Sequence, residues 1–329
     1  MKFLQSIKLF KRYFYSNSYM NQTKNELLAQ YYYSDSITED LSQVSPGIVV
    51  CFDGHIQHGG LADRLRGIVS VYSWCREHNV PFYINYTSPL ELTNWLVPNE
   101  YDWFLPASHL SYNSKIALPF VMIGWDNVEE VHAMLSFLHF IHPKKQLHIY
   151  CNSNPKKDSF HLLFKELFKL EDSLAKRLEV LQEHLFCDTS FVGMSFRFNQ
   201  LLGDFKDTIG TPLNEEEQQT LINKCIEEVD RLHRQNHPNS RVLITADSTK
   251  FIKKIAKSLD YVAIIPGKSV HMDQMRNEAK EAYTKVFIDM FMLSRATKVY
   301  LLCTGKMYRG AFGEYASLIG SIPYEVDEF

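Results

Sequence analysis

The sequence predicts an α/β protein built from two Rossmann-like lobes, each with a mostly parallel sheet. Three observations support this fold class. The length of 329 residues exceeds what one hydrophobic core usually supports, so two domains are expected. Short, continuously apolar segments alternate with amphipathic helical patterns over most of the chain. Strands that are apolar along their whole length are typical of a parallel sheet covered by helices on both faces.

The first lobe begins with an apolar strand at 47–53, bounded by Pro46 and Gly54. A helical pattern follows, with apolar residues three and four positions apart, and a second strand starts at Pro81. This β-loop-α-β order is the repeating unit of a parallel sheet. The remaining predicted elements of this lobe continue the alternation. The predicted elements, strands and helices together, are 47–53, 61–78, 81–86, 118–125, 129–141, 147–151 and 158–185.

The second lobe shows the same alternation more regularly. Its predicted elements are 190–198, 214–235, 241–246, 249–258, 261–266, 278–294, 298–303, 311–320 and 323–326. We therefore divide the chain into an N-terminal arm and two Rossmann-like lobes. These parts are 1–45, 46–170 and 171–329. The polar stretch from about 16 to 45 has weak periodicity and is predicted to be irregular. Ligands of such sheets bind outside the carboxyl ends of the strands, so the functional residues should lie there.

Composition and charge exclude several classes of protein. A formal charge of -3 and a pI near 6.5 provide no basic face for nucleic acid. The six cysteines include no Cys-x-x-Cys pair, so we expect neither a disulfide framework nor a structural zinc. No apolar segment is long enough to span a membrane, which predicts a cytoplasmic protein. Residues 1–15 fit either an amphipathic helix on the inner membrane surface or a disordered or packed leader.

A glycine-rich segment at 58–67 follows the first strand. Gly59 and Gly60 allow a tight turn and leave backbone amides open at a helix start, which suits an anion or a sugar hydroxyl. Asp63 lies in the first helical turn, where a carboxylate is favourable, and Arg64 could reach a ligand. The alternative is an ordinary helix start with solvated arginines.

A charged residue, Arg197, interrupts the apolar strand that opens the second lobe. A buried charge is rare unless it is paired or binds an anion, and the planar guanidinium fits a diphosphate. Asn199 and Asp204 follow in the loop and could orient the sugar or the arginine. The alternative is an arginine on the solvated face of an edge strand.

Polar residues also follow two later strands of this lobe. Asp247 and Ser248 lie between a strand and a helix, where either an N-cap role or contact with a ribose or guanine explains them. His271 and Asp273 follow the next strand, and their functional role is open because loop histidines are usually solvated.

The last glycine-rich segment precedes the C-terminal helix. Its small residues let a diphosphate approach the amides at the helix start, although such a turn can also serve geometry alone. The candidate donor-binding residues of this segment are Gly310, Ala311, Phe312 and Gly313.

Missing motifs also discriminate between functions. The chain has no Gly-x-Gly-x-x-Gly after a strand and no P-loop, which disfavours dinucleotide oxidoreductases and P-loop NTPases. It has no Gly-x-Ser-x-Gly elbow and no His-Glu-x-x-His zinc motif. Because no strand ends in a convincing Asp-x-Asp, we predict no metal ligands, and cationic groups and amides would stabilise a leaving diphosphate.

Three of these segments resemble motifs of the fucosyltransferase superfamily, which includes nodulation, α1,2-, α1,6- and protein O-fucosyltransferases. Residues 58–67 resemble its Gly-Leu-Gly-Asn-Arg loop, 195–205 its His-x-Arg-x-x-Asp motif, and 312–320 its C-terminal donor motif. The similarity extends over roughly 47–325 as short, spaced motifs. It differs at Ser195, where the family usually has histidine, and at Gly310 and Gly313, where it usually has serines.

The resemblance implies a GT-B fold, in which 46–170 is the acceptor lobe and 171–329 is the lobe that binds the nucleotide-sugar. It also implies a GDP-fucose donor, inversion at the anomeric carbon and no obligatory metal. It also implies that Arg197 contacts the β-phosphate, that Asp247 lies near the nucleoside, and that the amides of 311–313 lie near the diphosphate. We thus expect no cofactor beyond the donor substrate, and a glycan hydroxyl of a surface polysaccharide or oligosaccharide as acceptor.

The predicted reaction is a single displacement in which the acceptor hydroxyl attacks the anomeric carbon while Arg197 stabilises the charge on GDP. Asp63 and Asp204 are the candidate bases by location alone. Two other hypotheses remain open at this point. One is a glycosyltransferase of the same fold that uses another nucleotide-sugar, and the other is a non-catalytic protein that binds a sugar or nucleotide.

Overall fold

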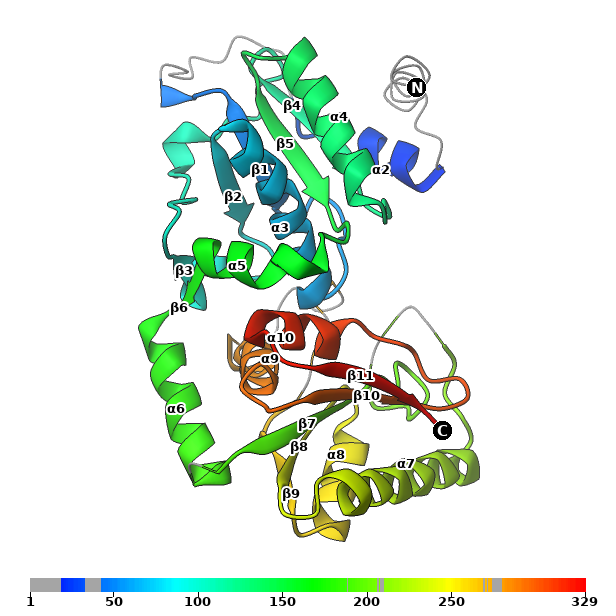
Figure 1. Cartoon of the computed structure of the whole chain (residues 1–329). Helices are drawn as coiled ribbons and strands as arrows, with labels where there is room; N and C mark the ends of the chain where they lie inside the picture. Colours follow the sequence, from blue (N-terminus) through cyan, green and yellow to red (C-terminus); the bar gives the residue numbers. More distant parts are fainter. Residues whose placement is uncertain are drawn as a thin grey trace. The chain divides into compact units, whose positions relative to one another are not determined.

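The structure, a computed structural model, describes residues 19–32, 43–187, 189–205, 207, 210–268, 270, 272–273 and 280–329. It forms two compact units, each described here by itself (Figure 1). Unit 1 comprises the described residues up to Leu92 together with Pro98–Lys169. Unit 2 comprises Thr93–Val97 and the described residues from Leu170 to Phe329. The early segment Thr93–Val97 in unit 2 is a feature that the sequence did not predict.

Unit 1 contains a four-stranded parallel sheet in the order β2-β1-β5-β4. Alternate residues of β1 face opposite sides of the sheet. Val49 and Cys51 lie on one side, in a cluster with Leu28 of α2 (Tyr19–Ala29), and the residues between them face α3 on the other side. Helices α3 and α4 pack against each other on that second side (Figure 1). The bounds are β1 Gly47–Phe52, α3 Leu61–His78, β2 Phe82–Tyr86, β4 Ala117–Met122, α4 Val128–Ile141, β5 Gln146–Cys151 and α5 Lys157–Leu167.

Helix α2 (Tyr19–Ala29) corrects one expectation from the sequence, because residues 16–45 were predicted to be irregular. Leu28 of α2 is fully buried in the cluster with Val49 and Tyr150, and the helix packs against β4. Its apolar periodicity is weak, so packing against the sheet rather than the local pattern stabilises the helix. The predicted membrane-surface segment, 1–15, lies outside the described residues.

Unit 2 contains a five-stranded parallel sheet in the order β11-β10-β7-β8-β9. Helices α7 and α8 cover the face that carries Val192 and Met194. Gly193 lies on the other face, against Leu293 of α9. The bounds are α6 Asp172–Phe186, β7 Phe191–Phe196, α7 Glu215–Asn236, β8 Arg241–Ala246, α8 Thr249–Ser258, β9 Val262–Ile264, α9 Lys280–Leu293, β10 Val299–Cys303, α10 Phe312–Gly320 and β11 Tyr324–Glu328.

Short elements lie where the chain passes from one unit to the other, and one further short helix lies within unit 1. Trp95 explains why its segment belongs to unit 2, because its indole donates to Thr284 Oγ1 at 3.0 Å and stacks on Phe287 at 5.3 Å. The short elements are the 3-10 helices Leu92–Asn94 and Ala107–His109 and the paired strands β3 Leu96–Pro98 and β6 Phe168–Leu170.

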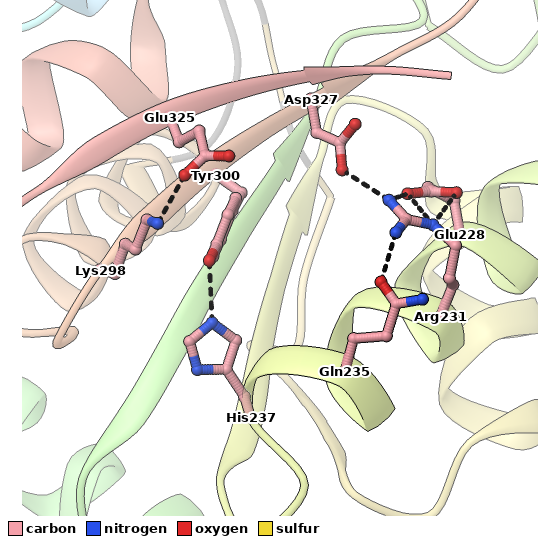
Figure 2. Close-up of polar contacts among 8 residues, drawn as sticks. All are labelled: Glu228, Arg231, Gln235, His237, Lys298, Tyr300, Glu325 and Asp327. Atoms are coloured by element: carbon pink, nitrogen blue, oxygen red, sulfur yellow. Dashed lines mark hydrogen bonds and ion pairs between the residues drawn. The ribbon is translucent and has the colours of Figure 1, made fainter.

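Polar contacts attach the edge strand β11 to the rest of unit 2 (Figure 2). Arg231 of α7 pairs with Glu228 on its own helix and, at 3.1 Å, with Asp327 of β11. Lys298 pairs with Glu325 of β11 at 2.5 Å. These ion pairs hold β11 beside β10. Strand β10 in turn leads into the loop before α10.

Two further findings concern the chain as a whole. In the part of the chain that the structure describes, no helix has both the length and the apolar character needed to cross a membrane. All six cysteines are free thiols, and Cys187 alone among them is exposed.

Candidate functional site

Arg197 is the first residue after β7, and two carboxylates bind its guanidinium. Its Nη2 lies 2.5 Å from Asp207 Oδ2, and its Nη1 lies 3.2 Å from Asp247 Oδ2. The ring of Phe205 lies 4.7 Å from the guanidinium carbon. The Arg197 side chain nevertheless keeps 24% of its surface exposed. It is therefore a held, partly accessible cation at the carboxyl end of a central strand.

Asp247, the first residue after β8, fixes the turn that follows Arg197. Its Oδ1 accepts the Phe198 N–H at 2.9 Å and its Oδ2 accepts the Asn199 N–H at 2.8 Å. Burial raises the pKa of Asp247 to about 6, although Arg197 and the two N–H groups oppose the shift. The carboxylate thus holds Asn199 in a left-handed conformation with φ 53. Its predicted contact with the nucleoside remains a prediction.

Asn199 presents an unused acceptor beside the arginine. The residue is 5% exposed, and its side-chain Oδ1 has no hydrogen-bond partner among the described residues. A buried polar atom without a partner is costly, so Asn199 Oδ1 is available to accept a hydrogen bond.

The glycine-rich loop before α10 packs directly on Arg197. A Cβ added at Gly310 would lie 3.3 Å from Arg197 Cγ, and the Tyr308 N–H donates to the Arg197 carbonyl at 3.1 Å. Helix α10 starts at Phe312, and its N-cap residue, Ala311, makes no side-chain cap. Helix N-termini attract anions. The structure therefore joins a cation and an uncapped helix start at one edge of the unit 2 sheet.

Two of the three departures from the family motifs, Ser195 and Gly313, belong to one packing arrangement. Ser195 Oγ donates to the Tyr300 carbonyl at 3.2 Å, and a Cβ added at Gly313 would lie 2.5 Å from that Oγ. A larger residue at position 313 would clash with the serine. The small residues at both positions thus allow α10 to approach β7 closely.

Ser248 and Asp204 both cap α8. Ser248 Oγ accepts the Phe251 N–H at 3.1 Å, and Asp204 Oδ2 accepts the Lys250 N–H at 2.7 Å. An N-cap role accounts for both side chains. Their proposed donor-binding and base roles remain predictions.

Unit 1 brings together the four candidates of the first glycine-rich segment, but it uses them to hold their own loop. Asp63 Oδ2 accepts the Gly60 N–H at 2.9 Å, which caps α3. Arg64 is 3% exposed and donates to the carbonyls of Gly59 and Ser88, at 3.1 and 2.8 Å. Position 59 requires glycine, because its φ is 99 and an added Cβ would lie 2.5 Å from Asp63 Oδ2.

A polar cluster that the sequence analysis missed lies at the carboxyl end of β1. Asp53 Oδ2 accepts the Tyr150 hydroxyl at 2.7 Å and the Tyr112 hydroxyl at 3.0 Å, and it lies 3.1 Å from His55 Nδ1. Burial alone would raise the pKa of Asp53, but hydrogen bonds from His55 and Tyr150 lower it to about 2. Its position directly after a buried strand was the signal that could have identified it.

Two other histidines complete the account of the loops. His58 is 2% exposed, and neither of its ring nitrogens has a hydrogen-bond partner among the described residues. Burial and the nearby Arg64 hold the pKa of His58 well below its usual range. His271 lies outside the described residues, while Asp273 is half-buried in a turn after β9. No group of three or more His, Cys, Asp or Glu side chains in the described ranges could hold a metal ion.

The solved structures most like this chain include three fucosyltransferases. NodZ α-1,6-fucosyltransferase soaked with GDP-fucose is 16% identical, with a TM-score of 0.52 and coverage of 83% of this chain and 92% of NodZ. NodZ in this set comes from Bradyrhizobium. A mutant of Arabidopsis thaliana FUT1 in complex with GDP is 12% identical, with a TM-score of 0.54 and coverage of 97% and 76%. POFUT1 in complex with GDP is 11% identical, with a TM-score of 0.51 and coverage of 87% and 99%.

The chain has the fold of these fucosyltransferases. The comparison confirms the predicted α/β, GT-B-like class, with mostly parallel sheets, and it confirms the resemblance to this superfamily at the level of the fold. No protein-family model and no curated protein sequence matches the chain.

Proposed function

We propose that the chain is a glycosyltransferase that transfers fucose from GDP-fucose to a glycan hydroxyl, with inversion and without a metal ion. The observation that carries the proposal is the position of Arg197 beside the uncapped start of α10. A diphosphate leaving group needs positive charge, and both the guanidinium and the helix amides supply it. The structural neighbours that were solved with GDP or GDP-fucose agree with this choice of ligand.

The contacts in unit 2 suggest how the donor would be held. Arg197 would bind a phosphate oxygen with the part of its guanidinium that now faces Asp207, and Asp247 would keep the arginine and the turn in place. Asn199 Oδ1 would accept a hydrogen bond from the nucleotide, because it lacks a partner among the described residues. The amides at Phe312 and Gly313 would stabilise the charge that develops on the diphosphate.

The acceptor and the location of the enzyme complete the proposal. We assign the acceptor to a surface polysaccharide or oligosaccharide, and we place the enzyme in the cytoplasm, with residues 1–15 as a contact to the inner membrane face. Basic and apolar residues alternate in that segment, as in helices that lie on anionic lipid.

Calorimetric titration of GDP, UDP and CMP, with EDTA present, tests the donor assignment. We expect GDP alone to bind, and we expect Arg197→Ala and Arg197→Lys to weaken GDP by ~30-fold or more, because truncating a desolvated charge pair typically costs several kcal/mol. Arg234→Ala, which removes an exposed arginine from α7, is the matched control and should bind GDP like the wild type.

Each other outcome has a defined meaning. Binding of UDP or CMP in place of GDP would favour another nucleotide-sugar, which the serine at position 195 makes worth testing. GDP binding without turnover on any glycan would favour a non-catalytic binding protein. Binding of GDP that is indifferent to Arg197 would refute the proposed diphosphate site.

A further inference from the structure

Helix α8 of unit 2 carries four lysines on one side and contains no acidic residue. It lies beside α7 on one face of the sheet, where Phe251 and Ile255 are fully buried (Figure 1). At 3.6 residues per turn, the lysine positions fall within an arc of about 100° on the side of the helix that faces away from these two residues. We name these four exposed residues the lysine stripe: Lys250, Lys253, Lys254 and Lys257.

Carboxylates do not neutralise the lysine stripe. Lys253, Lys254 and Lys257 form no ion pair with any other residue that the structure describes. Lys250 Nζ donates to the neutral side-chain oxygen of Gln218 at 2.6 Å. The ammonium groups of the stripe therefore remain available to an anionic partner.

The positive charge of the stripe is local. Residues 249–260 contain four lysines and one carboxylate, that of Asp260, so their net charge is +3, whereas the whole chain carries -3. Charge interactions between exposed groups are screened beyond about 8 Å at physiological ionic strength, so the stripe attracts a partner only at close range. Several other exposed cations of unit 2 are instead paired with carboxylates: Arg177 with Glu281, Arg231 with Glu228, Arg234 with Asp230, and Arg309 with Glu328.

We propose that the lysine stripe of α8 docks unit 2 onto a membrane surface rich in anionic phospholipids. The stripe extends about 10 Å along the helix axis, because each residue adds about 1.5 Å. Several ammonium groups can therefore approach a layer of anionic headgroups at the same time. Docking of this kind uses residues of unit 2 alone and requires neither the donor site nor residues 1–15.

The composition of the stripe favours lipid over a partner with fixed anionic positions. Lysine is a point charge on a flexible stem, whereas arginine provides the planar fork that recognises a defined phosphate or carboxylate. The exposed side of α8 carries no arginine, and its one aromatic residue, Phe251, is buried, so no ring is available to stack on a nucleobase. Anionic headgroups move laterally in a membrane, so each lysine can find its own partner there.

Co-sedimentation of the full chain with vesicles tests this docking surface. The vesicles contain phosphatidylcholine with phosphatidylserine, or phosphatidylcholine alone. We expect the wild type to bind only the anionic vesicles, and to bind them more weakly as salt rises from ~0.05 to ~0.5 M. The variant that combines Lys253→Gln, Lys254→Gln and Lys257→Gln should lose on the order of 100-fold in partition coefficient, because each lysine near an anionic surface strengthens binding about fivefold.

Two further variants separate the stripe from a general effect of charge. Glutamine and arginine both favour helix, so α8 should stay folded, and chemical denaturation checks this. Arginine at the same three positions should restore binding to within a few-fold of the wild type, because lipid responds to the charge. The matched control removes the same charge from three exposed lysines elsewhere in unit 2, and it should bind within a few-fold of the wild type. It combines Lys176→Gln, Lys268→Gln and Lys306→Gln.

Three results would overturn the docking surface. The first is an equal loss of binding in both glutamine variants, which would show a general effect of net charge. The second is wild-type binding by the α8 variant together with loss of binding in Lys8→Gln, Lys11→Gln and Arg12→Gln combined, which would assign the contact to residues 1–15. The third is a wild type that binds an acidic polysaccharide but no vesicle. GDP titration is measured in parallel, and normal GDP affinity in the α8 variant would show that the lysine stripe and the donor site act separately.

Discussion

Asp53 in unit 1 and Asp247 in unit 2 occupy the same place in their sheets, directly after a buried parallel strand, but they have different partners. Asp53 accepts two tyrosine hydroxyls and one backbone N–H, that of His55, and its Oδ2 also lies 3.1 Å from the His55 imidazole. Asp247 instead binds two backbone N–H groups and Arg197. The first carboxylate therefore orients side chains, and the second shapes a loop around a cation.

Both aspartates lie at a strand end, where functional residues are common, but this position does not determine what the carboxylate does. The two tyrosine partners of Asp53 lie 59 and 97 residues away along the chain, on a loop and on β5. Those of Asp247 lie 48 and 49 residues away, in the single loop after β7. The tertiary partners decide whether the carboxylate orients tyrosine side chains or holds an arginine and the turn that follows it.

Replacing Asp247 with alanine should have the largest effect. The change leaves two buried N–H groups without an acceptor and removes a charge from the Arg197 pair, so we expect a loss of roughly 3–5 kcal/mol of unfolding free energy. Chemical denaturation measures it, with the exposed Asp260→Ala as the control. A loss below about 1 kcal/mol would show that the turn after β7 does not depend on this carboxylate.

The pH dependence of stability should have opposite signs at the two aspartates. The pKa of Asp247 is raised to about 6, so its contribution is complete below the unfolded value near 3.8 and is lost as the pH rises through 6. The pKa of Asp53 is lowered to about 2, so its contribution is present above 3.8 and is lost as the pH falls through 2. Each change is on the order of 2–3 kcal/mol.

The asparagine variants measure these two contributions. The unfolding free energy of the wild type is measured between pH 2 and pH 7. Its decrease as the pH rises from 4 to 6 should be absent in Asp247→Asn, and its decrease as the pH falls from 4 to 2 should be absent in Asp53→Asn. If both substitutions removed a pH dependence of stability of the same sign, the contrast between the two aspartates would be contradicted.

Most of the fold could be predicted from local patterns. The continuous apolar segments at β7, β8 and β10 and the helical period of α8 indicate a parallel α/β sheet without any knowledge of tertiary contacts. Helix α2 could not be predicted in this way. It is stabilised by burial of Leu28 against the sheet, which no local period reveals.

The candidate site was predictable only in part. A charge at the end of an apolar strand identified Arg197, and glycines before a helix identified 310–313. The sequence did not reveal Asp207 as the partner of Arg197, because a carboxylate in a loop has no periodic signal. It also did not reveal that Asp53, Tyr112 and Tyr150 meet, since that contact depends on which strands are neighbours.

A comparison of Asp63→Ala with Ser248→Ala tests whether unit 1 uses Asp63 as a cap. Both side chains accept an N–H at a helix start, at 2.9 and 3.1 Å, so each change should cost ~1 kcal/mol of stability. GDP release by Asp63→Ala should stay within a few-fold of the wild type. A fully folded Asp63→Ala that has lost turnover but not GDP affinity would instead support the role of Asp63 as the base.

The smallest expected effect concerns Asp207, which lies 2.5 Å from the Arg197 guanidinium and has 5% of its side chain exposed. In unit 2 this carboxylate and a donor phosphate would compete for the same cation, whereas Asp247 also binds the backbone and would stay in place. Asp207→Asn should therefore tighten GDP binding by a few-fold, corresponding to at most ~1 kcal/mol, measured by calorimetry at fixed salt. Asp273→Asn, the same change in a turn after β9, serves as the control. Weaker GDP binding in Asp207→Asn would show that Asp207 positions the arginine for the phosphate, so that both aspartates of unit 2 support the cation.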